Sequence, residues 1–135
     1  MVWFDAFATN PDPTAQNPNI LVWHGRPWLI DHGAALYVHH TWKDPAAHAR
    51  RPFERIRDHI LLPFAGPISA ADDRLAPLVT RALLEELVAS IPDTWLTEIP
   101  LGDAATQRRA YVDYLAARLA HPRSFVAEAD DARAA

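Results

Sequence analysis

The sequence predicts an α+β fold that is mostly helical, with a single β-hairpin near the start of the chain. Two short apolar runs at residues 20–23 and 28–31 flank a His-Gly-Arg-Pro segment, which is typical of two paired strands. From residue 43 onward, apolar residues recur with helical spacing. Strands gathered at one end of the chain and helices at the other indicate an α+β architecture.

The first 42 residues are expected to form loop and hairpin. Three prolines within residues 9–18, without apolar periodicity, indicate an ordered loop. The four residues 24–27 are the expected connection of the hairpin, because Gly25 can adopt a positive φ. Both strands are rich in Trp, Ile, Leu and Val, so we expect them to be largely buried and to need a partner for the carboxylate of Asp31.

Three to four helices are expected in residues 43–135. A first helical run covers residues 53–61 and ends at Pro63. A second begins near Ser69, which resembles a capping box with Asp72, and continues to Pro92. A third runs from about residue 103 or 106 to 121, and a shorter helix covers residues 125–133.

Composition indicates one domain and excludes several classes of protein. The 135 residues are 50% hydrophobic and 22% charged, which suits a single soluble domain. A net charge of -4 argues against a nucleic-acid surface. The sequence has no cysteine and no apolar run long enough for a membrane span, so we expect a cytoplasmic protein without disulfides or membrane contact.

Polar residues that suit phosphoryl transfer bracket the hairpin in a fixed order. Asp12 lies in the preceding loop, Asn17 and Asn19 lie just before the first strand, and Asp31 ends the second strand. In phosphoryl transfer a loop Asp accepts the proton of the nucleophile, while an Asn and an Asp hold Mg²⁺ against the nucleotide phosphates. Oxygen ligands are the kind that Mg²⁺ prefers. The hairpin would then act as a rigid spacer between these groups.

Residues 3–42, WFDAFATNPDPTAQNPNILVWHGRPWLIDHGAALYVHHTW, closely resemble the catalytic-loop and metal-loop region of bacterial HipA-like kinases, which are related to the phosphatidylinositol kinases. The resemblance continues through ARRPFERIRDHILLPFAG to the end of the chain. It implies a kinase-like large lobe over residues 1–135, with the catalytic loop and hairpin in 1–42 and the helical part in 43–135. It also implies ATP and Mg²⁺ as cofactors and a protein Ser or Thr as the phosphate acceptor.

Carried over residue by residue, the resemblance makes Asp12 the catalytic base and Asp31 a Mg²⁺ ligand, with His32 where the Phe of an Asp-Phe-Gly motif usually stands. The nucleotide- and metal-binding Asn has two candidates. Asn17 keeps the five-residue distance from Asp12, whereas Asn19 directly precedes the strand, as the metal-binding Asn does in the lipid kinases. Asn19 is favoured because a strand constrains a ligand more than a loop does.

Several departures from the family pattern bear on activity. Pro13 stands where the family often has Arg, and Gln16 stands where a basic residue is expected. The sequence contains no Gly-rich phosphate loop, and its single lysine, Lys43, follows Asp31 instead of lying on an earlier strand. We therefore expect little activity from this chain alone and, as a partner, either a small-lobe chain or a second copy. The alternative is a non-catalytic interaction module that acts through homo- or hetero-association.

Two further residue groups have competing interpretations. The histidines at positions 32, 39, 40 and 48, with Asp31, offer a zinc site as an alternative to Mg²⁺, but no His-x-x-x-His spacing is present and hydrogen-bonded or surface roles are favoured. Trp23, Trp28 and Trp42 are expected to pack in the core or against another lobe rather than to stack on a ligand.

Overall fold

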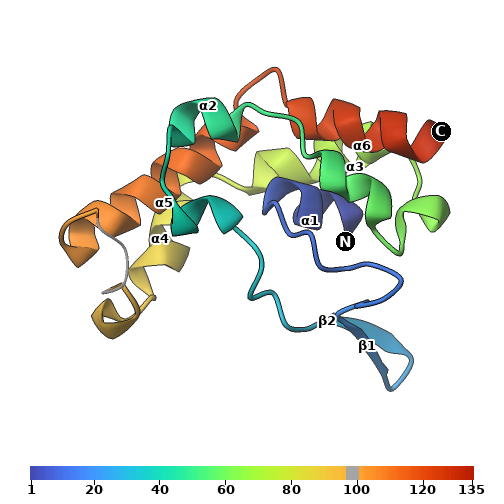
Figure 1. The fold of residues 1–135 in the computed structure, drawn as a ribbon, viewed down its shortest axis with the longest axis horizontal. Helices are drawn as coiled ribbons and strands as arrows, with labels where there is room; N and C mark the ends of the chain where they lie inside the picture. The colour runs from blue at the N-terminus through green and yellow to red at the C-terminus, as the bar shows by residue number, and fades with distance from the viewer. Residues whose placement is uncertain (97–100) are drawn as a thin grey trace.

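The computed structural model describes residues 1–96 and 101–135, and within these ranges it contains six α-helices and one antiparallel hairpin. Figure 1 shows a body of helices from which the hairpin projects. The coarse prediction of a mostly helical α+β fold is confirmed. The α-helices and strands are α1 (Val2–Phe7), β1 (Ile20–Trp23), β2 (Arg26–Leu29), α2 (Pro45–Ala49), α3 (Ile68–Leu75), α4 (Arg81–Ala89), α5 (Ala104–Leu119) and α6 (Ser124–Ala134). Short 3₁₀ turns join them: η1 (Tyr37–His40), η2 (Glu54–Asp58), η3 (Leu62–Phe64), η4 (Ala76–Leu78) and η5 (Asp93–Trp95).

Helix α1 is the centre of the largest hydrophobic core, where it packs on α3, α6 and η2. Trp3 stacks on Phe7, with ring centroids 5.4 Å apart, and both rings contact Phe125 of α6. Loop is expected for this segment from the sequence, so the helix is a correction. With six residues the helix is too short to give a clear periodicity, and it is stabilised by tertiary burial instead of by its own length.

A buried arginine joins three helices, and among the described residues it has no carboxylate partner. Arg118 of α5 donates to the carbonyl oxygens of Phe7 (2.7 Å), Ala6 (2.7 Å) and Ala49 (3.2 Å). These carbonyls end α1 and α2, where the helix dipole favours a cation. Its guanidinium also lies 4.9 Å from the ring centre of Phe125. Arg118 therefore fixes α1, which carries part of the site described below.

The helices after α2 correct two of the predicted segments. The predicted helix from Ser69 to Pro92 is two helices, because Pro77 interrupts the run in η4 and Thr80 caps a new helix, accepting from Leu83 N. The predicted helix at 53–61 is the 3₁₀ turn η2 followed by η3. By contrast, α5 and α6 confirm the two predicted C-terminal helices, and Asp103 caps α5 by accepting from Thr106 N at 2.8 Å.

The predicted capping box at Ser69 is wrong. Asp130 of α6 caps α3 instead, since its carboxylate accepts from the backbone N–H of Ile68 (2.6 Å) and of Ser69 (3.0 Å). Asp72 accepts from Trp3 Nε1 at 2.8 Å and from Arg123 Nη1 at 2.7 Å. Both carboxylates therefore connect α3 to other elements rather than serving their own helix.

The hairpin differs from the prediction in its turn and in its burial. Trp23 pairs with Arg26, so the connection is the two-residue turn His24-Gly25, with φ of 49° and 70°. The strands are exposed instead of buried: Val22 and Trp23 retain 69% and 59% of their accessible surface. Trp23 and Trp28 of the hairpin are exposed, whereas Trp42, which follows η1, packs in the core against Tyr111 and Tyr114. Among the described helices, none has the length and hydropathy of a membrane span.

Candidate functional site

The structure brings three of the four predicted site residues together at the base of the hairpin. Asn19 is buried, and its Nδ2 donates to the backbone oxygen of Asp31 at 3.0 Å and to Oδ2 of Asp12 at 3.4 Å. A single amide thus links the loop that carries Asp12 to the end of β2. Asn17 is exposed and contributes its backbone to the preceding turn, where its oxygen accepts from Thr14 N at 3.0 Å.

Both ends of the hairpin adopt a strained backbone conformation. Asn19 has φ of 46° and Asp31 has φ of 52°, in the left-handed region that non-glycine residues rarely occupy. Asn and Asp tolerate this region better than other residues, which explains these residue types at these two positions. A positive φ also occurs at Thr9, His24, Leu36, Trp42 and Asp44, so this conformation is not confined to the two ends of the hairpin.

The carboxylates of Asp12 and Asp31 are both accessible. Asp12 lines a hollow of about 430 Å³ together with Thr14, Gln16, Arg55 and Asp58. Asp31 is exposed, which corrects the expectation of a buried carboxylate that needs a partner. Asn19 makes both of these hydrogen bonds through its amide nitrogen. The ligands expected from the sequence are all oxygen atoms, the kind that Mg²⁺ prefers over softer metals.

A buried carboxylate in α1, missed by the sequence analysis, lies behind this site. Asp5 has no accessible surface; its Oδ1 accepts from Asn10 Nδ2 at 2.8 Å and its Oδ2 from His59 Nε2 at 3.1 Å. His59 Nδ1 accepts from the backbone N–H of Leu61 at 3.0 Å, so the proton of this imidazole resides on Nε2. Burial acts to raise the pKa of Asp5, but the hydrogen bonds from His59 and Asn10, together with the charge interactions with His59 and His32, outweigh it and hold the pKa below its ordinary value.

His32 approaches the same carboxylate from the hairpin side. The His32 Nε2 atom is buried and lies 3.3 Å from Asp5 Oδ1. The two atoms do not form a hydrogen bond. The ring of His32 packs against Phe4, with centroids 5.9 Å apart. The sequence offers one signal for this cluster, an Asp within an otherwise apolar segment. It does not indicate which of the histidines, all distant in sequence, contact that Asp.

The described ranges 1–96 and 101–135 contain no group of three His, Asp or Glu side chains placed to hold a metal, so the fold gives no preformed site either for the zinc alternative or for Mg²⁺. His39 and His40 contact each other, with ring centroids 4.0 Å apart. Burial and the neighbouring His40 lower the pKa of His39. His48 Nδ1 lies 3.0 Å from the hydroxyl of Tyr114, a separate contact within the helical body.

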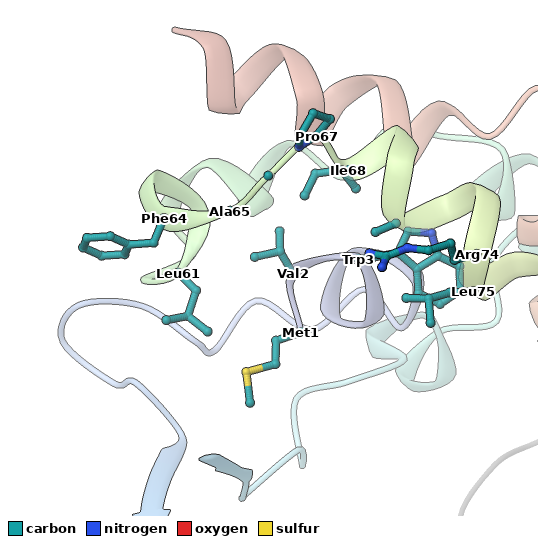
Figure 2. Close-up of a pocket in the computed structure, with 12 residues that line it drawn as sticks. Met1, Val2, Trp3, Leu61, Phe64, Ala65, Pro67, Ile68, Arg74 and Leu75 are labelled. Carbon is teal, nitrogen blue, oxygen red and sulfur yellow. The ribbon is translucent and has the colours of Figure 1, made fainter. Parts of the chain in front are cut away.

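A second hollow, of about 390 Å³, lies at the start of α1, on the side of α3 (Figure 2). Its lining is apolar apart from Arg74, and Figure 2 shows Val2 and Ile68 facing it from α1 and α3. The described residues that line it include no carboxylate and no histidine, in contrast to the hollow beside Asp12. It therefore offers neither a base nor a metal ligand for phosphoryl transfer.

Comparisons of the chain with protein-family models, with curated proteins and with solved structures found no match. The chemistry of the site therefore rests on its own residues and on their order along the sequence.

Proposed function

We propose that this chain is the large lobe of a HipA-like kinase, which transfers the γ-phosphoryl group of ATP to a Ser or Thr hydroxyl of a protein. The observation that supports this most is the Asn19 amide that joins the Asp12 carboxylate to the backbone of Asp31. This link supports the predicted order Asp, Asn, hairpin, Asp-x-Gly, because Asn19 and Asp31, which are 12 positions apart, are joined by a hydrogen bond.

The proposed roles follow from the order of Asp12, Asn19 and Asp31 along the chain and from the link that Asn19 makes between the other two. Asp12 faces the hollow in which an acceptor hydroxyl would lie, and it accepts the proton as the hydroxyl oxygen takes the phosphoryl group and ADP leaves. Asp31 and Asn19 Oδ1 would hold Mg²⁺, which when bound offsets the charge of the phosphates. Asn17, exposed and turned into the loop, is the weaker candidate for that ligand.

The charge around Asp12 supports low turnover rather than none. Pro13 and Gln16 provide no cation, and although Arg55 lines the same hollow as the proposed base, so does the carboxylate of Asp58. No residue in the sequence matches the strand lysine or the Gly-rich loop that clamp ATP in protein kinases. We therefore propose that efficient turnover requires a partner that supplies these groups.

Calorimetric titration of ATP, with and without Mg²⁺, tests the proposal. Wild-type chain is expected to bind ATP more tightly with Mg²⁺ than without it, and the isosteric Asp31→Asn variant is expected to lose this difference. The matched control is Asp73→Asn, which removes an exposed carboxylate on α3. Equal affinity with and without Mg²⁺ in the wild-type chain would contradict the proposal.

The exposed hairpin favours a second candidate, a non-catalytic interaction module. Leu21, Val22, Trp23 and Trp28 are each about half exposed or more, and the two indole rings lie 6.2 Å apart. Clustered exposed apolar side chains of this kind are typical of protein–protein contact surfaces. This candidate requires that Val22→Glu abolish association in sedimentation velocity, whereas Asp31→Asn leaves association intact.

A further inference from the structure

The Asp5 carboxylate contacts side chains from three separate segments of the chain. Asn10 belongs to the loop before Asp12, His32 follows Asp31, and His59 ends η2. Asp5, Asn10 and His59 are all nearly inaccessible, so these contacts are shielded from water. A buried carboxylate is costly unless donors surround it, and in this cluster every neighbouring donor belongs to a segment next to the proposed site.

On one side, Asp5 reaches the loop that carries Asp12. Besides the side-chain bond, the backbone N–H of Asn10 donates to Asp5 O at 2.8 Å, and Asn10 Oδ1 accepts from Asp12 N at 3.4 Å. His59 holds the other end of the same loop, because it forms an isolated β-bridge with Thr14 and the next residue, Ile60, donates to Pro13 O at 2.7 Å. The residues on both sides of Asp12 are thus tied to the Asp5 cluster.

On the other side, Asp5 reaches the loop that carries Asp31. His32 Nε2 lies 3.3 Å from the carboxylate oxygen that Asn10 also uses. Among the described residues, His32 is the side chain that links Asp5 to this loop, through this close contact rather than a hydrogen bond, and the contact adjoins the left-handed residue Asp31.

We propose that Asp5 is a positioning residue that couples the Asp12 loop to the Asp31 loop, acting through Asn10 and His59 on one side and His32 on the other. The inference rests on the proposed function for its catalytic meaning, but the coupling itself is a property of the fold. It assigns a role to a residue outside the Asp, Asn, Asp-x-Gly pattern.

A purely structural role for Asp5 would have a different signature. Asp72 provides the comparison, because it is also a buried carboxylate that is bonded to α1, through Trp3, and to Arg123. Its partners lead to no residue of the proposed site. If Asp5 only stabilises the core, then Asp5→Asn and Asp72→Asn should have the same effect on the two loops.

Amide hydrogen exchange distinguishes the two roles. Four amides report on the loops: Thr14 and Ile60 for the Asp12 loop, and Ile30 and Ala35 for the Asp31 loop, since each donates to a backbone oxygen within or beside its loop. Leu84 in α4, which donates to Thr80 O, is the distant reference. Asp5→Asn is expected to accelerate exchange at all four amides about 10-fold more than at Leu84, as for the loss of a hydrogen bond to a charged group.

Asp72→Asn is expected to leave these loop-to-reference ratios unchanged. If Asp5→Asn does not fold, His32→Phe serves instead, because it keeps a ring against Phe4 and removes only the nitrogen atoms. Although this substitution lies in the Asp31 loop, it is expected to accelerate exchange at Thr14 and Ile60. Acceleration in one loop only, or equal ratios in the Asp5 and Asp72 variants, would overturn the coupling.

A parallel titration with ATP and Mg²⁺ separates this inference from the proposed function. Asp5→Asn is expected to weaken Mg²⁺-dependent ATP binding about 10-fold, while Asp72→Asn stays within about 2-fold of the wild-type chain. If the wild-type chain binds no ATP, the proposed function fails, and the exchange ratios still decide whether Asp5 couples the loops.

Discussion

Replacing Asn19 tests the site at the residue that joins its parts. Asn19→Ala removes the 3.0 Å hydrogen bond to Asp31 O and the longer one to Asp12. Loss of a neutral hydrogen bond of this kind costs about 1 kcal/mol. Placing Ala at φ of 46° adds only part of the roughly 1–2 kcal/mol that the left-handed conformation costs, because the Cβ of Asn already bears some of this cost and Ala lacks only the local hydrogen bonding that relieves it. The free energy of unfolding should therefore fall by about 1.5–2.5 kcal/mol.

The glycine variant separates the side chain from the backbone. Asn19→Gly also lacks both hydrogen bonds, but glycine adopts a positive φ freely, so its free energy of unfolding should fall by only about 1–1.5 kcal/mol. Urea unfolding followed by the fluorescence of the buried Trp3 and Trp42 measures both values. Both variants should lose Mg²⁺-dependent ATP binding, while Asn17→Ala should retain it.

Two results would refute this reasoning. Equal destabilisation by Ala and Gly at position 19 would mean that the left-handed backbone is not held in solution. Loss of Mg²⁺-dependent binding in Asn17→Ala, together with its retention in Asn19→Gly, would make Asn17 the nucleotide-site residue and the Asn19 bridge a feature of the fold alone.

Three further predictions concern the scaffold and its response to pH. Arg118→Met should lower the free energy of unfolding by about 3 kcal/mol in urea, because three buried carbonyls lose a cationic donor; a loss below about 1 kcal/mol would contradict its role. Asp130→Ala should cost about 1 kcal/mol through loss of the α3 cap, measured in the same way, and an unchanged stability would exclude capping. The folded-state pKa of Asp5 lies below its ordinary value of 3.8, so its contribution to stability is present above that value and is lost as pH falls through the folded-state pKa. Asp5→Asn should therefore be less stable than the wild-type chain at neutral pH and show a shallower acid limb in thermal unfolding, and an unchanged acid limb would count against the lowered pKa.

Local signals in the sequence were sufficient where an element depends on neighbouring residues. The place of the turn at Gly25, though not its two-residue length, the start of α5 near residue 103 and the loop of residues 9–18 all follow from residue types within a few positions. The break at Pro77 was equally local, and the apolar run through it was misinterpreted as a continuous helix.

Other features could not be predicted because they depend on contacts between distant segments. Asp130 caps a helix 62 residues earlier, and His59 reaches Asp5 across 54 residues. The exposure of the hairpin has the same origin, since the apolar character of Val22 and Trp23 indicates burial only if another element covers them. For the site, the order of Asp12, Asn19 and Asp31 was readable, but the Asn19 bridge required the fold.

Paramagnetic broadening by Mn²⁺ in the presence of ATP tests the proposed site most directly, because it locates the metal on the chain. Backbone amides of Asp31, Asn19 and Asp12 are expected to broaden first, those of Leu84 and Val88 in α4 are expected to stay sharp, and Asp31→Asn should remove the effect. Broadening centred elsewhere, or none when ATP and Mn²⁺ are both present, would contradict a metal–nucleotide site at the base of the hairpin.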